Sequence, residues 1–255
     1  ALMADTKQTP FVGHQLNVVE EDVPSTAVRV VFADSENHLW LGAGSYGVVR
    51  KDSETGEQVF HTRIPEFSEV ESVPTVNTVI QRANGELWFG TYDGGILVYR
   101  KGEKVKVLTD ANTRYLYSRC VTALYEDSRK NCWVGCRGGL GVNLEDGGYY
   151  KFGVMPFENG GVSTWYHVRD IVEDIDGSVW VATANCGIIH VRGNVTHAET
   201  LKYNNYSQRN KQLAVNSVLC LHVDKAGRLW AGTEGNGLYL YDRKKDAFLE
   251  KSHSY

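Results

Sequence analysis

The sequence is poor in several features that would point to other classes of protein. Its 255 residues include only 5 prolines and 2 methionines. No apolar run approaches the roughly 18 residues that a membrane-spanning helix needs, so we expect no such helix in the chain. Residues 1–8 have neither a basic start nor an apolar stretch, so they do not predict a secretory signal peptide.

The chain also has no excess of positive charge. It carries 27 basic and 31 acidic residues, which gives a formal net charge of −4, and no basic stripe is visible. Proteins that bind nucleic acid usually present such a stripe, so we expect no nucleic-acid partner. The 26 glycines and 14 tyrosines are typical of a soluble β domain, and this length is sufficient to bury a large core or several smaller ones.

Against this background, one pattern occurs five times. Tryptophans recur at spacings of 48, 45, 47 and 50 residues, and a valine stands 12 residues before each of them. The tryptophans are Trp40, Trp88, Trp133, Trp180 and Trp230, and the valines are Val28, Val76, Val121, Val168 and Val218. A period of this length indicates a repeat protein.

The segments between these positions are typical of β-strands. Residues 76–80 and 121–125 are rich in β-branched and aromatic side chains, which favour a pleated sheet. A turn follows this first strand, with Asp six residues before the tryptophan in four repeats and Gly three residues before it in three. The strand that holds the tryptophan comes next, and a glycine-containing turn then leads to a third strand. A more polar fourth segment completes each unit. Four antiparallel strands per repeat predict an all-β fold, a β-propeller with one blade for each repeat.

The repeat register places the blades along the chain. We expect an N-terminal segment, 1–25, with an orphan outer strand, and five full blades over 26–255. The predicted blade boundaries are 26–70, 71–115, 116–162, 163–212 and 213–255. Five whole blades either close into a ring or form a piece of a larger propeller, and we favour the piece. The uncovered faces of such a piece would favour self-association or contact with adjoining blades.

The five tryptophans are predicted to be structural. A single four-stranded sheet cannot bury both of its faces, whereas neighbouring blades can cover one another. Trp40, Trp88, Trp133, Trp180 and Trp230 are therefore expected in the core between blades and not in contact with a ligand. Trp165 lies outside the repeat register and is the exception.

The repeat resembles a known family. Residues 168–183 read Val-Arg-Asp-Ile-Val-Glu-Asp-Ile-Asp-Gly-Ser-Val-Trp-Val-Ala-Thr, which is similar to the two-component regulator propeller repeat. Arg82, Cys136 and Ala182 depart from that pattern. The resemblance implies the extracytoplasmic, periplasmic sensor region of a hybrid two-component histidine kinase of the Bacteroides type. It also implies that kinase, membrane and DNA-binding parts lie outside this chain.

Catalytic and metal-binding motifs are not found in the sequence. There is no Gly-x-Ser-x-Gly, His-Glu-x-x-His, P-loop or EF-hand motif, so we expect neither an enzyme nor a cofactor in this segment. Cys120, Cys132 and Cys220 fall on strand positions and are expected to be small buried side chains. Cys132 and Cys136 have no second ligand pair, so no metal site is predicted. The spacing does not decide whether any of the five cysteines form a disulfide.

The predicted binding face is formed by loops. In a propeller, the turns between second and third strands lie on the same side as the loops between blades, and loops vary more freely than the framework. The candidate ligand-binding residues in the turns are Tyr46, Tyr92, Asp93, Arg137, Asn185, Glu234 and Asn236. Those in the loops between blades are Arg114, Tyr115, Tyr117, Trp165 and Tyr166.

Aromatic rings interleaved with planar polar groups suit a carbohydrate, since sugar faces stack on rings and hydroxyls need both donors and acceptors. Three functions compete: a sensor of an oligosaccharide or other small ligand, a propeller enzyme such as a polysaccharide or lactone lyase, and a protein-interaction scaffold. The resemblance favours the sensor.

Overall fold

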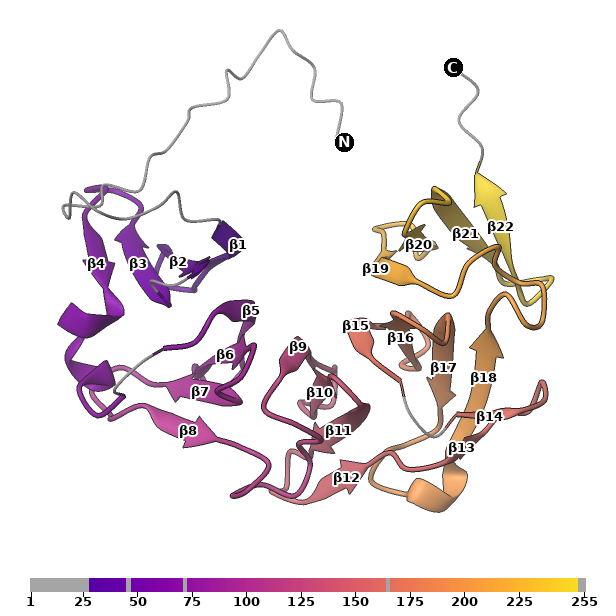
Figure 1. The fold of residues 1–255 in the computed structure, drawn as a ribbon, viewed down its shortest axis with the longest axis horizontal. Coiled ribbons are helices and arrows are strands. Elements are labelled where there is room, and N and C mark those ends of the chain that lie inside the picture. The colour runs from indigo at the N-terminus through magenta and orange to yellow at the C-terminus, as the bar shows by residue number, and fades with distance from the viewer. Residues whose placement is uncertain (1–27, 45–46, 71–72, 164–165, 252–255) are drawn as a thin grey trace, which may run out of the picture.

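The computed structural model describes residues 28–44, 47–70, 73–163 and 166–251, and within these ranges the fold is the predicted all-β propeller arrangement. Five four-stranded antiparallel sheets follow one another along the chain, each with its strands in sequential order. Figure 1 shows them set side by side in an open arc, with the first strand of each sheet on the inner side. The orphan strand predicted within residues 1–25 lies outside the described residues.

The strands of the first three blades have the following bounds. The first blade contains β1 (Val28–Ala33), β2 (His38–Ala43), β3 (Val48–Asp52) and β4 (Gln58–Phe60). The second contains β5 (Val76–Gln81), β6 (Leu87–Thr91), β7 (Ile96–Tyr99) and β8 (Lys106–Leu108). The third contains β9 (Val121–Glu126), β10 (Cys132–Cys136), β11 (Gly139–Asn143) and β12 (Tyr149–Lys151).

The remaining two blades complete the arc. The fourth contains β15 (Val168–Glu173), β16 (Val179–Thr183), β17 (Ile188–Arg192) and β18 (Lys202–Tyr206). The fifth contains β19 (Val218–Val223), β20 (Leu229–Thr233), β21 (Leu238–Asp242) and β22 (Ala247–Lys251). The connections hold a two-stranded hairpin, β13 (Met155–Pro156) with β14 (Val162–Ser163), and the short 3-10 helices η2 (His61–Arg63), η3 (Pro65–Phe67) and η4 (Ala198–Thr200). No described helix has the length and hydropathy needed to cross a bilayer.

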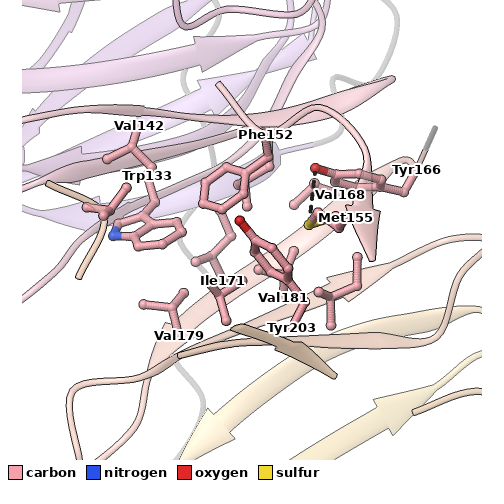
Figure 2. Packing of buried hydrophobic residues seen from close by; sticks show 14 of the residues in the cluster. Trp133, Val142, Phe152, Met155, Tyr166, Val168, Ile171, Val179, Val181 and Tyr203 are labelled. Atoms are coloured by element: carbon pink, nitrogen blue, oxygen red, sulfur yellow. Dashed lines mark hydrogen bonds between the residues drawn. The ribbon is translucent and has the colours of Figure 1, made fainter. Parts of the chain in front are cut away.

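In each of the first four blades, the repeated tryptophan faces the blade that follows. Trp40 lies 5.3 Å from Phe89 and 5.0 Å from Tyr99 of the second blade, measured between ring centroids. Trp133 packs in one buried cluster with Val179 and Val181 of the fourth blade, as Figure 2 shows. The first four repeated tryptophans are buried, which confirms their predicted place in the core between blades.

The turn aspartate has a second role that the sequence pattern did not predict. In addition to accepting backbone amides, it accepts the indole N–H of the tryptophan six residues later, with Nε1–Oδ2 distances of 2.7–3.0 Å in four blades. In the second blade Arg82 occupies the turn position, and Glu86 accepts the indole N–H of Trp88 at 3.0 Å instead. The motif therefore places a carboxylate against every indole, because a buried N–H without a partner is costly.

The two ends of the arc lack a covering blade among the described residues. Val31 of β1 is 59% exposed, whereas the equivalent Val79, Leu124, Ile171 and Leu221 are between 2 and 7% exposed. At the other end, Trp230 is only partly buried. The prediction that all five tryptophans lie between blades is therefore wrong for Trp230, since no described blade follows the fifth blade (Figure 1).

The cysteines are all free. Cys132 and Cys136 are buried, as expected for small apolar side chains, and Cys120 is intermediate. The prediction of burial is wrong for Cys220, which is exposed because it lies in the innermost strand of the last blade.

Candidate functional site

The turns between second and third strands lie against the segments that enter the innermost strands. The N–H of the residue that follows the second strand donates to the carbonyl just before the innermost strand in four blades: Tyr92 to Thr75 at 2.8 Å, Arg137 to Cys120 at 3.0 Å, Ala184 to His167 at 2.8 Å and Glu234 to Ser217 at 3.0 Å. These bonds fix both sets of loop residues on one face of the arc, which we call the loop face.

A β-bulge directs one residue of each innermost strand out of the sheet. The strand pairing skips the residue that follows the repeated valine in all five blades, because the register shifts at that point. A bulged residue is unpaired in the ladder, and bulges commonly re-aim side chains at the rims of sheets. The residues concerned are Arg29, Asn77, Thr122, Arg169 and Leu219.

Four of these bulge residues help to line a pocket of about 330 Å³ on the loop face, which we call the central pocket. Two of the predicted site residues, Tyr92 and Arg137, also line it. Its full lining is Arg29, Asn77, Tyr92, Cys120, Thr122, Arg137, His167, Val168 and Arg169. These residues belong to the first four blades, so the central pocket exists only because the blades are held side by side.

Some of the lining residues also join neighbouring blades. The Asn77 side-chain amide donates to the Val121 carbonyl at 3.0 Å, and the Thr122 hydroxyl donates to the Val168 carbonyl at 2.6 Å. An isolated antiparallel bridge pairs Arg137 with His167. The floor of the central pocket is thus fixed by hydrogen bonds, whereas Tyr92, at 55% exposure, is free to contact a ligand.

The central pocket is electrostatically positive. Its lining contains three arginines and no carboxylate. Partial burial, and then the neighbouring Arg169 and Arg137, lower the pKa of His167 below its ordinary value, so its imidazole is neutral at neutral pH. Burial also raises the pKa of the Cys120 thiol, and Arg137 opposes that shift only partly.

Three other polar residues predicted for the site lie next to residues of the central pocket, whereas Asn236 has no described contact with its lining. Asn185 accepts the backbone N–H of His167 at 3.0 Å, and Glu234 lies 3.5 Å from the Arg169 guanidinium. Asp93 is exposed in the same turn as Tyr92. Asn236 lies in the corresponding turn of the last blade, where its amide donates to the hydroxyl of Tyr239 at 2.7 Å.

The structure corrects the predictions for the loops between blades. Tyr115 and Tyr166 are buried core residues, 7% and 1% exposed, so they are not available to a ligand. Burial raises the pKa of both hydroxyls. The Tyr166 hydroxyl lies 3.9 Å from the Met155 sulfur (Figure 2). Tyr117 donates its hydroxyl to the Phe152 carbonyl, which also makes it structural.

Arg114 is also separate from the central pocket. Its guanidinium lies 5.8 Å from the ring centroid of Tyr149, on the outermost strand of the third blade. The physical reason is shared with Tyr115 and Tyr117: the loop after β8 packs against the third blade, where Lys151 Nζ donates to the Leu116 carbonyl at 3.1 Å. Tyr46 and Trp165 lie outside the described residues.

The sequence contains a signal for the bulge residues of the central pocket, which were not among the predicted site residues. The position after the repeated valine is polar in four of five copies, although its neighbours are mostly apolar. A polar residue at one register position of successive innermost strands indicates a shared lining. The bulge that turns it toward that lining could not be foreseen from periodicity alone.

A second pocket, of about 240 Å³, lies between the second and third blades on the opposite side, and its lining includes Arg82, Glu126 and Lys130. There the Arg82 Nε donates to Glu126 at 2.6 Å, and its Nη2 donates to the Lys130 carbonyl at 2.8 Å. Because this arginine is already satisfied, the pocket offers less to a ligand than the central pocket.

Comparison with known proteins supports the repeat and the fold. Residues 212–235 match the family described as two component regulator propeller. No sequence among the curated proteins matches the chain. An extracellular domain assigned to a hybrid two component system of B. thetaiotaomicron is similar at a TM-score of 0.69 and 24% identity, over 88% of this chain and 28% of that one.

Two further solved structures share the fold. PorZ, a surface component of the type-IX secretion system of Porphyromonas gingivalis, is similar at a TM-score of 0.66 and 18% identity, over 91% of this chain and 34% of that one. A streptogramin B lyase is similar at a TM-score of 0.63 and 14% identity, over 91% of this chain and 71% of that one.

At such identities the likenesses establish the fold only, and the chain spans about a third or less of the first two proteins. The family match is independent of these structural likenesses, and it falls on the fifth tryptophan repeat. The chain is thus a row of five propeller blades, and its residues 212–235 match the two component regulator propeller family.

Proposed function

We propose that this chain is a non-catalytic ligand-sensing domain of a two-component signalling receptor. It would act on the periplasmic side of the membrane and bind an oligosaccharide or a similar extracellular cue in the central pocket. The observation that carries the proposal is the assembly of that pocket from four blades, with Tyr92 and Arg137 at its mouth. Two-component propeller relatives support the signalling role.

The arrangement suits a sensor for a physical reason. A ligand that contacts residues of several blades stabilises one arrangement of those blades over others, and that difference in affinity is what a signal requires. An exposed tyrosine ring can stack on a sugar face, while Asn77 and Asn185 supply both donors and acceptors. Kinase activity would lie in other parts of the receptor.

Thermal shift of the 255-residue chain against a panel of oligosaccharides tests the proposal. Tyr92→Ala and Arg137→Ala should abolish or strongly reduce the stabilisation by a binding oligosaccharide, with little change in the melting temperature of the free protein, since both side chains are exposed. Tyr149→Ala and Arg114→Ala are matched controls, because these residues form a pair away from the central pocket. Equal ligand responses in all four variants would reject the pocket as the site.

The competing enzyme function is tested in the same samples. The propeller fold is shared with a streptogramin B lyase, so polysaccharide and lactone substrates are incubated with the chain and analysed for new products. Turnover that is lost in the central-pocket variants would replace the sensor proposal with an enzyme. Absence of binding by any small ligand, together with capture of a protein partner on the loop face, would favour the scaffold.

A further inference from the structure

The central pocket concentrates positive charge in a protein that is acidic as a whole. The chain has a formal net charge of −4, yet Arg29, Arg137 and Arg169 reach this one pocket from three different blades. Like charges gathered in one place repel one another, and they are maintained at functional sites where an opposite charge binds.

The three arginines are largely unneutralised within the protein. Arg29 and Arg137 have no ion-pair partner within 4.0 Å in the described ranges. Arg169 has one, Glu234, at 3.5 Å, but its buried Nε has no hydrogen-bond partner among the described residues. A guanidinium offers five N–H donors in a planar fork that matches a carboxylate or sulfate. Apart from the buried Arg169 Nε, most of these donors therefore remain available to a ligand.

Glu234 has the position of an internal counterion. Its Oε2 accepts the Ser217 hydroxyl at 2.6 Å and lies 3.5 Å from the Arg169 Nη2. It is not part of the pocket lining. A bound anion would compete with Glu234 for Arg169, so removing the charge of Glu234 should strengthen the binding of anions.

We propose that the central pocket selects an acidic oligosaccharide and that Arg137, Arg169 and Arg29 bind its carboxylate or sulfate group. The inference rests on the proposed function, since it names the class of ligand that the sensing site takes. Tyr92 supplies a stacking surface for the sugar ring beside the anion. Glu234 pairs with Arg169 when no ligand is bound and so lowers the affinity of the pocket for the anion. Burial, and then the positive charges of Arg169 and Arg137, lower the pKa of His167.

Isothermal titration of the 255-residue chain with three disaccharides of equal length tests the proposal: a neutral one, one with a hexuronate residue and no sulfate, and one with a single O-sulfate and no hexuronate. The two charged disaccharides should bind at least roughly tenfold more tightly than the neutral one, since hydrogen bonds to charged groups are the stronger ones. Their affinity should fall several-fold when NaCl is raised from about 50 to about 500 mM. Whichever charged form binds more tightly identifies the anion as carboxylate or sulfate.

Arg137→Gln and Arg169→Gln should each lower the affinity for the charged disaccharides by roughly tenfold or more, and leave that for the neutral one unchanged. Arg114→Gln, at the rim of the third blade, is the matched control and should change neither. Glu234→Gln should raise the affinity for the charged disaccharides. The melting temperature of each free variant establishes that it is folded.

The outcomes separate this inference from the proposed function. If the neutral disaccharide binds as tightly as the charged ones, the anion assignment is wrong while the sensor proposal stands. If neither these disaccharides nor any oligosaccharide of the thermal-shift panel binds, both are wrong. If inorganic sulfate stabilises the chain as strongly as the sulfated disaccharide, the assignment to a saccharide is overturned. A loss of affinity for all saccharides in Glu234→Gln would overturn the role of Glu234 as a counterion.

Discussion

The inner blades and the terminal blades of this arc contain the same motif in different surroundings. Trp180 of the fourth blade is fully buried, with its ring stacked on His190 at 3.6 Å and within 6 Å of Tyr206, Tyr241 and Phe248. Trp230 of the fifth blade has the equivalent strand position and donates its indole N–H to the equivalent turn aspartate, Asp224, yet it is only partly buried. The motif therefore determines the strand and the hydrogen bond, while the next blade determines the burial.

The opposite end of the arc shows the same difference. Val28 and Val31 of the first blade are 41% and 59% exposed, whereas Val76 and Val79 of the second blade are buried. In repeat proteins, stability is approximately a sum of terms for each repeat and for each interface. An inner blade has two interfaces and a terminal blade has one, which makes the comparison measurable.

The largest expected effect comes from the tryptophans. Trp180→Ala should lower the free energy of unfolding by about 3–5 kcal/mol, because it leaves a large cavity between two blades. Trp230→Ala should cost clearly less, since part of its ring already contacts water. Urea denaturation of both variants measures the difference, and equal losses would contradict a role for the neighbouring blade.

Acid should weaken the interface between the fourth and fifth blades selectively. Burial, and then the nearby Arg192, lower the pKa of His190 to about 4. Because the unfolded chain protonates this histidine near pH 6.5, its contribution is fully present above that pH and is lost as the pH falls from 6.5 to about 4. The difference between these pKa values corresponds to about 3 kcal/mol.

His190→Phe tests this directly, because it keeps a ring against Trp180 and removes the titrating group. The change removes the His190 Nδ1, which has no hydrogen-bond partner among the described residues, and also the Nε2 hydrogen bond with the Ser178 hydroxyl at 2.7 Å. The loss of stability between pH 6.5 and 4 should be smaller in the variant than in the parent chain. Identical pH profiles would show that other groups cause the acid sensitivity.

The smallest expected effect comes from the equivalent valines. Val79→Ala, 6% exposed in the parent, should cost about 2 kcal/mol, whereas Val31→Ala should stay within about 0.5 kcal/mol. Thermal or urea denaturation of the matched pair measures this. If Val31→Ala proved as costly as Val79→Ala in the isolated chain, the face of the first blade would be covered in solution.

Much of the framework could be predicted from the sequence, because the constraints on it are local and repeated. Alternating apolar strands, turn residues and a tryptophan at a fixed offset specify a blade wherever they occur. The second repeat still forms a blade although Arg82 replaces the turn aspartate, since Glu86 supplies the missing carboxylate to Trp88.

The site was less predictable, because loop residues of one type differ in burial and in the residues that they contact. Tyr92, Tyr115 and Tyr166 all lie in loops, but only Tyr92 is exposed, because the loops after β8 and β14 pack their rings into the core. Arg114 and Arg137 are the same residue type and both lie in loops. However, Arg114 packs on the ring of Tyr149, whereas Arg137 lines the central pocket. Composition does not encode which way a connecting loop folds.

By itself the sequence determined five four-stranded units, their order and the strand that holds each tryptophan, because periodicity and strand propensity act within one repeat. Only the tertiary structure decided which of these tryptophans are fully buried and which loop residues meet. A β-bulge in each innermost strand turns one side chain inward, and blades about 45 residues apart in sequence must then lie side by side for those side chains to form a pocket. That convergence depends on distances between repeats, which no single repeat contains.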